Sequence, residues 1–418
     1  MTIMAISRLL NFLIVILLSR MLGPHGYGVY AFVFSIITLL SIPVQAGIPT
    51  LVVRETAKAH ANNDWQTIQG LLHWAVCLIC VFSLVVFAIV AGVFSIGFIS
   101  IDPIRKVTLL SGIMLIPLLA LVMTQGSAIR GLGKVLLGQL NYNVIRPCLF
   151  ILLLLATHYF ALIHEIGPEQ AMQLQLFSMA MAVILGALII KYLQPQGGLN
   201  SLYQNAPAWR SSILPLSLVA GFQLLNSNFD ILMLGLIRSD HEVGIYRVIV
   251  QMANLIMFGL GAINQVLHPH FAKLYSSGEK EKLQRLVTIS SRIILIFAIP
   301  PVLCFIFAGP YILRLFFGEE YSAGGYALII LSVGQLINTA FGSVGALLNM
   351  TGHEKDTVRG LMISAIINIL LNIILIPQYG MNGAAFATAV SYLAWNAVMR
   401  KYVRKRIDIE SCGLRLGK

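Results

Sequence analysis

The chain has 418 residues, of which 58% are hydrophobic and only 11% are charged. A soluble domain carries about 25% charged residues, because its surface faces water. The composition therefore excludes an ordinary soluble protein and predicts an integral membrane protein. The net charge of +12 does not predict a nucleic-acid partner, because the basic residues lie mainly on one side of the predicted membrane.

Apolar stretches of the length of membrane spans recur along the whole chain. About twelve of them, with their flanks, reach the length that an α-helix needs to cross the hydrocarbon layer. Backbone groups in that layer must bond to each other, and Gly and Ala are plentiful, so we expect α-helices rather than barrel strands. The predicted spans are residues 2–22, 27–50, 70–94, 107–128, 135–157, 170–192, 211–236, 243–267, 285–309, 323–349, 358–376 and 381–400.

The basic residues predict the orientation of these spans. When the N-terminus is placed in the cytoplasm, most of the 28 Lys and Arg residues fall on the cytoplasmic side, as the positive-inside rule requires. The few on the outer side are Arg20, Arg105, Lys106, Arg238 and Arg314. Both termini are then expected in the cytoplasm, and the number of spans is even.

The first span lacks a small-residue cleavage site, so we expect it to be an uncleaved insertion signal. The expected location is the cytoplasmic (inner) membrane of a bacterium or an archaeon. The basic segment 401–418 is predicted to be a cytoplasmic tail that binds anionic membrane lipids.

A polar, turn-rich linker at residues 194–210 separates two predicted six-helix bundles, residues 1–193 and residues 211–400. The halves share motifs: Tyr-Gly-Val-Tyr at 27–30 opens the second span, and Val-Gly-Ile-Tyr at 243–246 opens the eighth. Such repeats usually enclose a path through the membrane. The sequence therefore predicts an all-α membrane protein with two pseudo-symmetric six-helix bundles around a central cavity, working by alternating access.

Polar residues inside the predicted spans are the candidates for substrate binding, because ionisable groups in the bilayer are costly and usually functional. The candidates are Arg8, Asn11, Arg146, Asn226, Asp230, Arg247, Gln251 and Asn254. Amides at helical spacing can instead lock helices together, and arginines near helix ends can extend to the interface. Asp230 could pair with an arginine, Arg8 or Arg247, as a structural ion pair, or titrate as a coupling site, and the sequence leaves these alternatives open.

No catalytic, cofactor-binding or metal-binding motif is found in the sequence. Residues 131–134, Gly-Leu-Gly-Lys, lack the strand that precedes a phosphate-binding loop. The pairs His164-Glu165 and His353-Glu354 lack the second histidine of a zinc-binding helix. We therefore expect no cofactor, no metal and no enzymatic activity.

Several longer motifs carry a resemblance to a known family. They are Leu-Gly-Pro-His-Gly-Tyr-Gly-Val-Tyr at 22–30, His-Pro-His-Phe-Ala-Lys-Leu-Tyr at 268–275, Leu-Phe-Phe-Gly-Glu-Glu-Tyr at 315–321 and Ile-Leu-Ile-Pro-Gln-Tyr-Gly-Met-Asn-Gly-Ala-Ala at 374–385. With them the chain resembles the polysaccharide-export branch of the multidrug/oligosaccharidyl-lipid/polysaccharide superfamily, and in particular its O-antigen-type flippases.

The resemblance implies a substrate, an oligosaccharide on a polyprenyl diphosphate that moves from the cytoplasmic to the outer leaflet. It also implies a role in O-antigen, capsule or exopolysaccharide synthesis, H⁺ or Na⁺ as the coupling ion, and a downstream glycan polymerase as a partner. Ser7-Arg8 is similar to a Ser-Arg pair in the first helix of related peptidoglycan lipid flippases, which implies that Arg8 faces the cavity.

Two other functions remain open from the sequence. One is a cation-coupled multidrug exporter of the same superfamily, which would need an acidic rather than a basic cavity. The other is a membrane glycan polymerase or ligase, which resembles proteins with a long outer loop that carries the chemistry. The outer connections predicted here are short, so the flippase is the prediction that we carry forward.

Overall fold

The computed structural model describes residues 2–45, 47–96, 102–159, 166–193 and 206–410. Within these ranges the chain is helical and contains no strand. Apolar helices long enough to cross a membrane recur along it. The predicted class, an all-α integral membrane protein, is confirmed.

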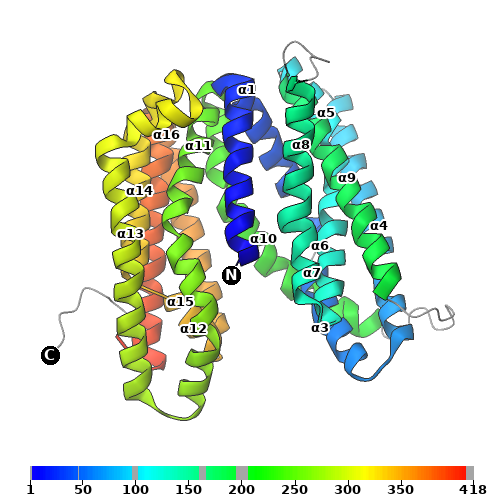
Figure 1. The fold of residues 1–418 in the computed structure, drawn as a ribbon, viewed down its shortest axis with the longest axis vertical. Coiled ribbons are helices and arrows are strands. Elements are labelled where there is room, and N and C mark those ends of the chain that lie inside the picture. Colours follow the sequence, from blue (N-terminus) through cyan, green and yellow to red (C-terminus); the bar gives the residue numbers. More distant parts are fainter. Residues whose placement is uncertain (1, 46, 97–101, 160–165, 194–205, 411–418) are drawn as a thin grey trace. The chain divides into compact units, whose positions relative to one another are not determined.

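The helices follow one another with short connections (Figure 1). In chain order they are α1 (Thr2–Leu40), α2 (Ile42–Gln45), α3 (Ile48–Ala61), α4 (Trp65–Ile96), α5 (Pro103–Gly112), α6 (Leu115–Gly131), α7 (Val135–Leu140), the π-helix η1 (Asn141–Ile145), α8 (Arg146–Tyr159), α9 (Pro168–Leu193), α10 (Ala206–Ile237), α11 (Asp240–Ile256), α12 (Phe258–Ser276), α13 (Lys280–Phe317), the 3₁₀-helix η2 (Glu319–Gly324), α14 (Gly325–Ala340), α15 (Val344–Met350) and α16 (Glu354–Arg406).

Eight helices of the described residues are long and apolar enough to span a membrane. The bent pair Asp240–Ile256 and Phe258–Asn264 would make a ninth span if it crosses as one. The longest of them, α16, has 53 residues and would extend about 80 Å if it were straight, far more than one span needs. The predicted total of twelve spans stays a prediction.

Both of the long helices α1 and α16 are interrupted at a glycine. Gly23 in α1 has φ 65° and Gly380 in α16 has φ 55°, a region of backbone conformation that glycine adopts without steric cost. Each bend falls between two predicted spans and within a motif that carries the family resemblance. The glycines of these motifs therefore have a structural reason.

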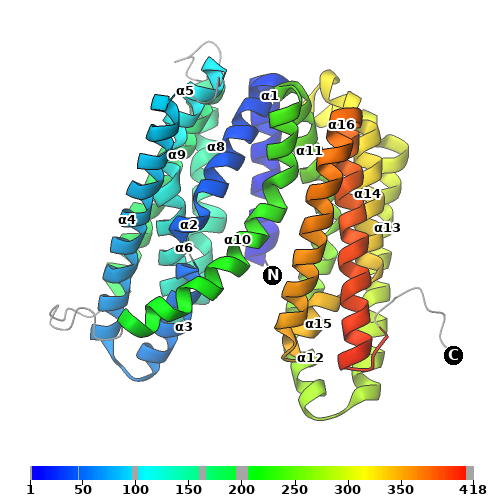
Figure 2. The same ribbon diagram turned by 180° about the vertical axis from the view of Figure 1, so that it is seen from behind.

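The two arms of α16 lie side by side and antiparallel (Figure 2). Ser364 on the first arm donates a hydrogen bond of 2.9 Å to the carbonyl of Ser391 on the second. Gly360 on the first arm lies against Met399 on the second, and a Cβ at residue 360 would collide with the Met399 side chain. Small residues let helix backbones approach closely, which is how helices associate within lipid.

The chain divides into two compact units, which we describe separately: the N-terminal unit, Thr2–Asn228, and the C-terminal unit from Phe229 onward. The boundary falls inside α10. The predicted linker 194–210 lies mostly outside the described residues, and the predicted domain limits stay a prediction.

One end of the C-terminal unit is packed around a hydrophobic cluster from α12, α13, α15 and α16. Its buried members are Leu267, Phe271, Leu283, Val287, Val344, Leu347, Leu348, Met399, Val403, Ile407 and Ile409. Ile407 and Ile409 belong to the segment predicted as a free tail, and Glu410 next to them accepts a hydrogen bond of 2.9 Å from Arg400. The first part of that segment therefore packs against its own unit, while residues 411–418 lie outside the described residues.

Phe271 tests this cluster, since its side chain is fully buried there. Phe271→Ala should lower the free energy of unfolding by about 3–5 kcal/mol, because the surrounding side chains cannot fill the cavity that is left. Phe297→Ala is the control, because Phe297 on α13 is 65% exposed on its helix. The midpoint of thermal unfolding in detergent should fall only for Phe271→Ala, and equal shifts for both variants would contradict the packing described here.

Candidate functional site

The first candidate residues lie on α1 in the N-terminal unit. Asn11 donates its side-chain N–H to the carbonyl of Ser7 at 2.7 Å, so this amide bonds to its own helix. Arg8 lies between them on the chain and is partly buried. The structure thus places Ser7, Arg8 and Asn11 within one turn, as the sequence spacing requires.

Arg146 is the most deeply buried cation among the candidates. Only 8% of the residue is exposed. Its guanidinium lies 4.8 Å from the centroid of the Tyr142 ring, a cation–π contact. Its Nε has no hydrogen-bond partner, and among the described residues no carboxylate forms an ion pair with it under a 4 Å limit. A buried guanidinium without a counter-charge is available for an anion.

A π-helical turn fixes the position of Arg146. The backbone N–H of Arg146 donates to the carbonyl of Asn141, five residues earlier, and Pro147 follows immediately. Proline has no N–H and disrupts a regular helix at this point. Single π-turns are frequent at functional sites.

Two amides pack beside this turn. Asn141 donates to the carbonyl of Ala182 at 2.8 Å, and Gln125 donates to the carbonyl of Val183 at 3.1 Å. Gly186 on the same helix, α9, leaves the room that both amides occupy. We call Gln125, Asn141 and Arg146 the N-unit polar cluster. It joins α6, η1, α8 and α9 within the N-terminal unit.

Asp230 lies at the centre of a second cluster, in the C-terminal unit. It is 7% exposed, and its Oδ2 accepts two hydrogen bonds of 2.9 Å. One comes from the Tyr246 hydroxyl on α11 and the other from the Thr388 hydroxyl on α16. Hydrogen bonds to a charged group are stronger than those between neutral groups. The carboxylate therefore links three helices through neutral donors.

Two asparagines of the first arm of α16 extend this arrangement. Asn368 donates to Thr388 Oγ1 at 3.4 Å, and Asn372 donates to Asn368 Oδ1 at 3.0 Å. Asn372 is fully buried, and its own Oδ1 has no hydrogen-bond donor. We call Asp230, Tyr246, Thr388, Asn368 and Asn372 the Asp230 cluster. It gathers a carboxylate, hydroxyl oxygens and amide oxygens in one buried place.

A further polar network ties α14 to its neighbours in the same unit. Gln335 donates to Asn254 and to Tyr392, both at 3.4 Å. Asn338 donates to Gln335 at 3.3 Å, and Asn396 donates to Asn338 at 2.6 Å. These bonds cross between α11, α14 and α16. They support the alternative that polar residues at helical spacing lock helices together.

The remaining candidates have different surroundings. Arg247 is partly buried on α11 and acts electrostatically on Asp230, although no ion pair joins these two residues. Gln251 is partly buried and Asn254 is exposed. The side chain of Asn226 lies outside the described residues. Whether the candidates of the two units line one central cavity stays a prediction.

The sequence did not single out every residue of the two clusters. Thr388 sits among alanines and follows Asp230 by 158 positions, and nothing local marks it. Tyr246 entered only as part of a repeated motif. Gln125 gave no signal except that it is an amide inside an apolar run. Asp230 and Arg146 were found because charges are rare in the spans.

The two His-Glu pairs that the sequence analysis set aside as zinc motifs gain no metal-binding partner among the described residues. His164 and Glu165 lie outside them. The ring Nδ1 of His353 is 3.2 Å from the hydroxyl of Thr351. In the part of the chain that the structure describes, no group of three or more His, Cys, Asp or Glu side chains could hold a metal ion.

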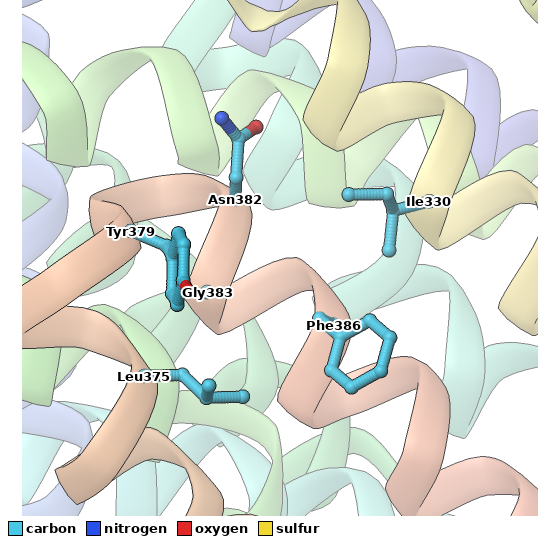
Figure 3. Close-up of a pocket in the computed structure, with 6 residues that line it drawn as sticks. All are labelled: Ile330, Leu375, Tyr379, Asn382, Gly383 and Phe386. Carbon is cyan, nitrogen blue, oxygen red and sulfur yellow. The ribbon is translucent and has the colours of Figure 1, made fainter.

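An apolar pocket of about 300 Å³ adjoins the bend of α16 (Figure 3). It is lined by Ile330, Leu375, Tyr379, Asn382, Gly383 and Phe386. Tyr379 and Phe386 are 61% and 50% exposed. None of the residues that line the pocket is charged, and none belongs to the Asp230 cluster.

The sequence matches the family described as "Polysaccharide biosynthesis protein" over residues 1–275. The chain belongs to this family. Residues 215–374 also match the family described as MatE. The superfamily that the motifs predicted is thereby confirmed. The prediction of a multi-pass membrane protein of the flippase type is also confirmed.

Three relatives illustrate this membership. The probable low-salt glycan biosynthesis flippase Agl15 of Haloferax volcanii is 24% identical over 43% of this chain and 38% of its own length. The capsular polysaccharide biosynthesis protein CapF of Staphylococcus aureus is 28% identical over 43% of this chain and 45% of its own. In both cases the matched part is less than half of the relative. The lipid II flippase MurJ of Bacillus subtilis is 24% identical over 93% of this chain and 78% of its own length.

Solved structures share the fold. An inward-facing multidrug MATE transporter has a TM-score of 0.79 at 14% identity, covering 96% of this chain and 94% of that chain. The lipid II flippase MurJ in an inward closed conformation has a TM-score of 0.76 at 15% identity, covering 95% of this chain and 86% of that chain. At these identities the comparison shows that this member of the polysaccharide biosynthesis family has the same architecture as both transporter types.

Tyr246→Phe tests the Asp230 cluster, because it removes one donor to the buried carboxylate and little else. The free energy of unfolding should fall by about 1.5–3 kcal/mol, the usual contribution of a hydrogen bond to a charged group. Tyr379→Phe is the matched control, since Tyr379 is 61% exposed. Unfolding in detergent followed by circular dichroism should separate the two variants, and an unchanged Tyr246→Phe protein would contradict the assigned bond.

Proposed function

We propose that the protein is a flippase that moves an oligosaccharide linked to polyprenyl diphosphate from the cytoplasmic to the outer leaflet by alternating access. The moved unit serves cell-surface polysaccharide synthesis. The observation that carries the proposal is Arg146, a buried guanidinium with no carboxylate partner among the described residues. The orientation that goes with it has both termini in the cytoplasm, in the inner membrane.

The chemistry of such a substrate explains why a buried cation would be kept. The polyprenyl tail is soluble in the bilayer, whereas the diphosphate and the sugars are not. A charge inside the membrane costs several kcal/mol or more, so it persists where it serves a ligand. Arginine suits the role because its planar fork of N–H donors matches phosphate oxygens. Amide side chains such as Asn11 and Gln251 can replace the water around sugar hydroxyls.

The names of the relatives support this proposal. Agl15 is described as a probable flippase for glycan biosynthesis, CapF as a capsular polysaccharide biosynthesis protein and MurJ as a lipid II flippase. Their names refer to glycan biosynthesis, to capsular polysaccharide and to lipid II. The matching family is also described by polysaccharide biosynthesis. O-antigen as the particular product and a glycan polymerase as a partner stay predictions from the resemblance.

We place the coupling ion at the Asp230 cluster. Asp230 offers a carboxylate, Thr388 a hydroxyl oxygen and Asn372 a buried amide oxygen without a donor. Hard cations prefer oxygen ligands of this kind. A proton would need only the carboxylate, whereas several oxygens together favour Na⁺ over H⁺. The nearby charge of Arg247 weakens cation binding, which would help the ion to leave during the cycle.

A multidrug exporter is the second candidate, because residues 215–374 match the MatE family and the MATE fold is shared. Its substrates would be organic cations. The guanidinium of Arg146, which has no carboxylate partner among the described residues, repels a cation and attracts an anion. It therefore favours the flippase over the multidrug exporter.

Arg146→Ala should therefore reduce flipping at least about tenfold, since a charge-assisted contact to phosphate is worth more than 1.4 kcal/mol. The assay is movement of a labelled polyprenyl-diphosphate oligosaccharide across proteoliposome membranes. Arg146→Lys should be intermediate, because lysine keeps the charge and loses the fork. Arg285→Ala is the control, as Arg285 is exposed on α13. Unchanged lipid flipping by Arg146→Ala, together with export of a cationic dye, would favour the multidrug exporter.

Asp230→Asn should abolish the stimulation of flipping by an imposed Na⁺ gradient while the protein still folds, because asparagine has nearly the shape of aspartate without its charge. Asp408→Asn is the control, since Asp408 is exposed. The measurement is the initial flipping rate with and without the gradient. Full stimulation of Asp230→Asn would show that the ion binds elsewhere.

A further inference from the structure

The bend of α16 leaves backbone groups that a regular helix would pair. In an α-helix the N–H of Met381 would donate to the carbonyl of Pro377, four residues earlier. Gly380, with φ 55° and ψ −132°, breaks the helix between them. A buried backbone N–H or C=O group that is left without a partner costs about 1–3 kcal/mol. Something must therefore take the place of this hydrogen bond.

Two side chains do so, one from the connection between α10 and α11 and one from the first turn of α11. Arg238 donates through Nε to the carbonyl of Ile376 at 3.1 Å and through Nη2 to the carbonyl of Pro377 at 2.9 Å. Glu242 accepts the N–H of Met381 at 3.2 Å. A cationic donor thus holds the first arm of α16, and an anionic acceptor holds the second. We call Arg238 and Glu242 the bend clamp.

The glycine at the bend belongs to the same fit. A Cβ added to Gly380 would collide with Oε2 of Glu242. Glu242 therefore reaches Met381 only because residue 380 has no side chain. The absence of a side chain and the positive φ require glycine here for two separate reasons.

The three elements that meet at the bend clamp also meet at the Asp230 cluster. Asp230 lies on α10 about two helical turns before Arg238, or roughly 12 Å along the helix. Tyr246 lies one turn after Glu242 on α11, and Thr388 lies about two turns after Met381 on α16. Two sets of contacts, one at the bend and one at the carboxylate, thus join the same three helices (Figure 2).

We propose that Arg238 and Glu242 are positioning residues: Arg238 holds the end of the first arm of α16 and Glu242 the start of the second, so that Thr388 stays bonded to Asp230. They thereby set how tightly the Asp230 cluster holds its cation. This inference rests on the proposed function, which places the cation there. Neither residue touches the carboxylate. Both act through the position of α16, and the sequence alone marked Arg238 only as a basic residue of an outer loop.

The test separates affinity from rate. Glu242→Ala and Arg238→Ala should raise the half-saturating Na⁺ concentration for flipping about tenfold, as the loss of residues that orient ligands typically does. The maximal rate at saturating Na⁺ should stay within about twofold, since the ligands themselves remain. Glu242→Gln should restore the wild-type concentration, because its amide oxygen still accepts the N–H of Met381. Full-length protein in proteoliposomes is used throughout, with Na⁺ replaced by choline at constant ionic strength.

His241→Gln is the matched control. His241 lies next to Glu242 in the first turn of α11, and its Nε2 is 3.5 Å from Oε2 of Glu320. The half-saturating Na⁺ concentration of His241→Gln should equal that of the wild type. If Glu242→Ala is not recovered as a folded protein, Arg238→Lys is compared with the wild type instead. Lysine keeps the charge but lacks the planar fork that donates to the carbonyls of Ile376 and Pro377 at once.

The outcomes distinguish this inference from the function on which it rests. If the wild-type protein flips its substrate without any dependence on Na⁺, the proposed coupling site is wrong. If the wild type depends on Na⁺ and Asp230→Asn removes that dependence while the clamp variants match the wild type, the bend clamp has no positioning role and the coupling site stands. If clamp variants lose maximal rate and thermal stability with no change in half-saturating Na⁺, the clamp is only structural and the inference is overturned.

Discussion

The constraint on which this structure depends is that a backbone within lipid must satisfy its own hydrogen bonds. Most of the described chain meets it with continuous helix. At two places where the regular helix is interrupted, another group takes the place of the lost hydrogen bond. At the bend of α16 the carbonyl of Pro377 and the N–H of Met381 are paired by Arg238 and Glu242. At η1 the N–H of Arg146 moves to the carbonyl of Asn141. Polar side chains concentrate where regular helix ends, so departures from it create the places where a ligand can be held.

The two units hold opposite charges in different ways. In the N-terminal unit, Arg146 is buried with an aromatic ring beneath it and no carboxylate partner in the described part of the chain. In the C-terminal unit, Asp230 is buried with two hydroxyl donors and no ion pair. Each charge is held by neutral groups, which leaves its field available for a ligand of opposite sign. This arrangement suits the anionic substrate and the driving cation that we propose.

Other polar residues of the spans are better explained as structural. Gln335, Asn338 and Asn396 bond to one another across α14 and α16, and such bonds within lipid hold helices at one register. The Asp230 cluster uses the same helices but contains an acceptor without a donor on Asn372. A network in which every group is paired fixes helices, whereas a network with a free acceptor can take a ligand. This difference separates two groups of residues that look alike in the sequence.

The sequence by itself determined the class, the positions of most spans and the family, because hydropathy, rare charges and glycine-rich motifs are local properties. It also singled out Arg146 and Asp230, since a charge in an apolar run stands out without any partner. Only the tertiary structure decided that Thr388 is a partner of Asp230 and that Arg238 closes the bend of α16. These contacts join residues 158 and 139 positions apart. Periodicity along a helix shows which face of the helix a residue lies on, but not which distant helix packs against that face. Nothing in the neighbouring sequence marks the threonine as a partner of the carboxylate, or the loop arginine as a partner of two backbone carbonyls.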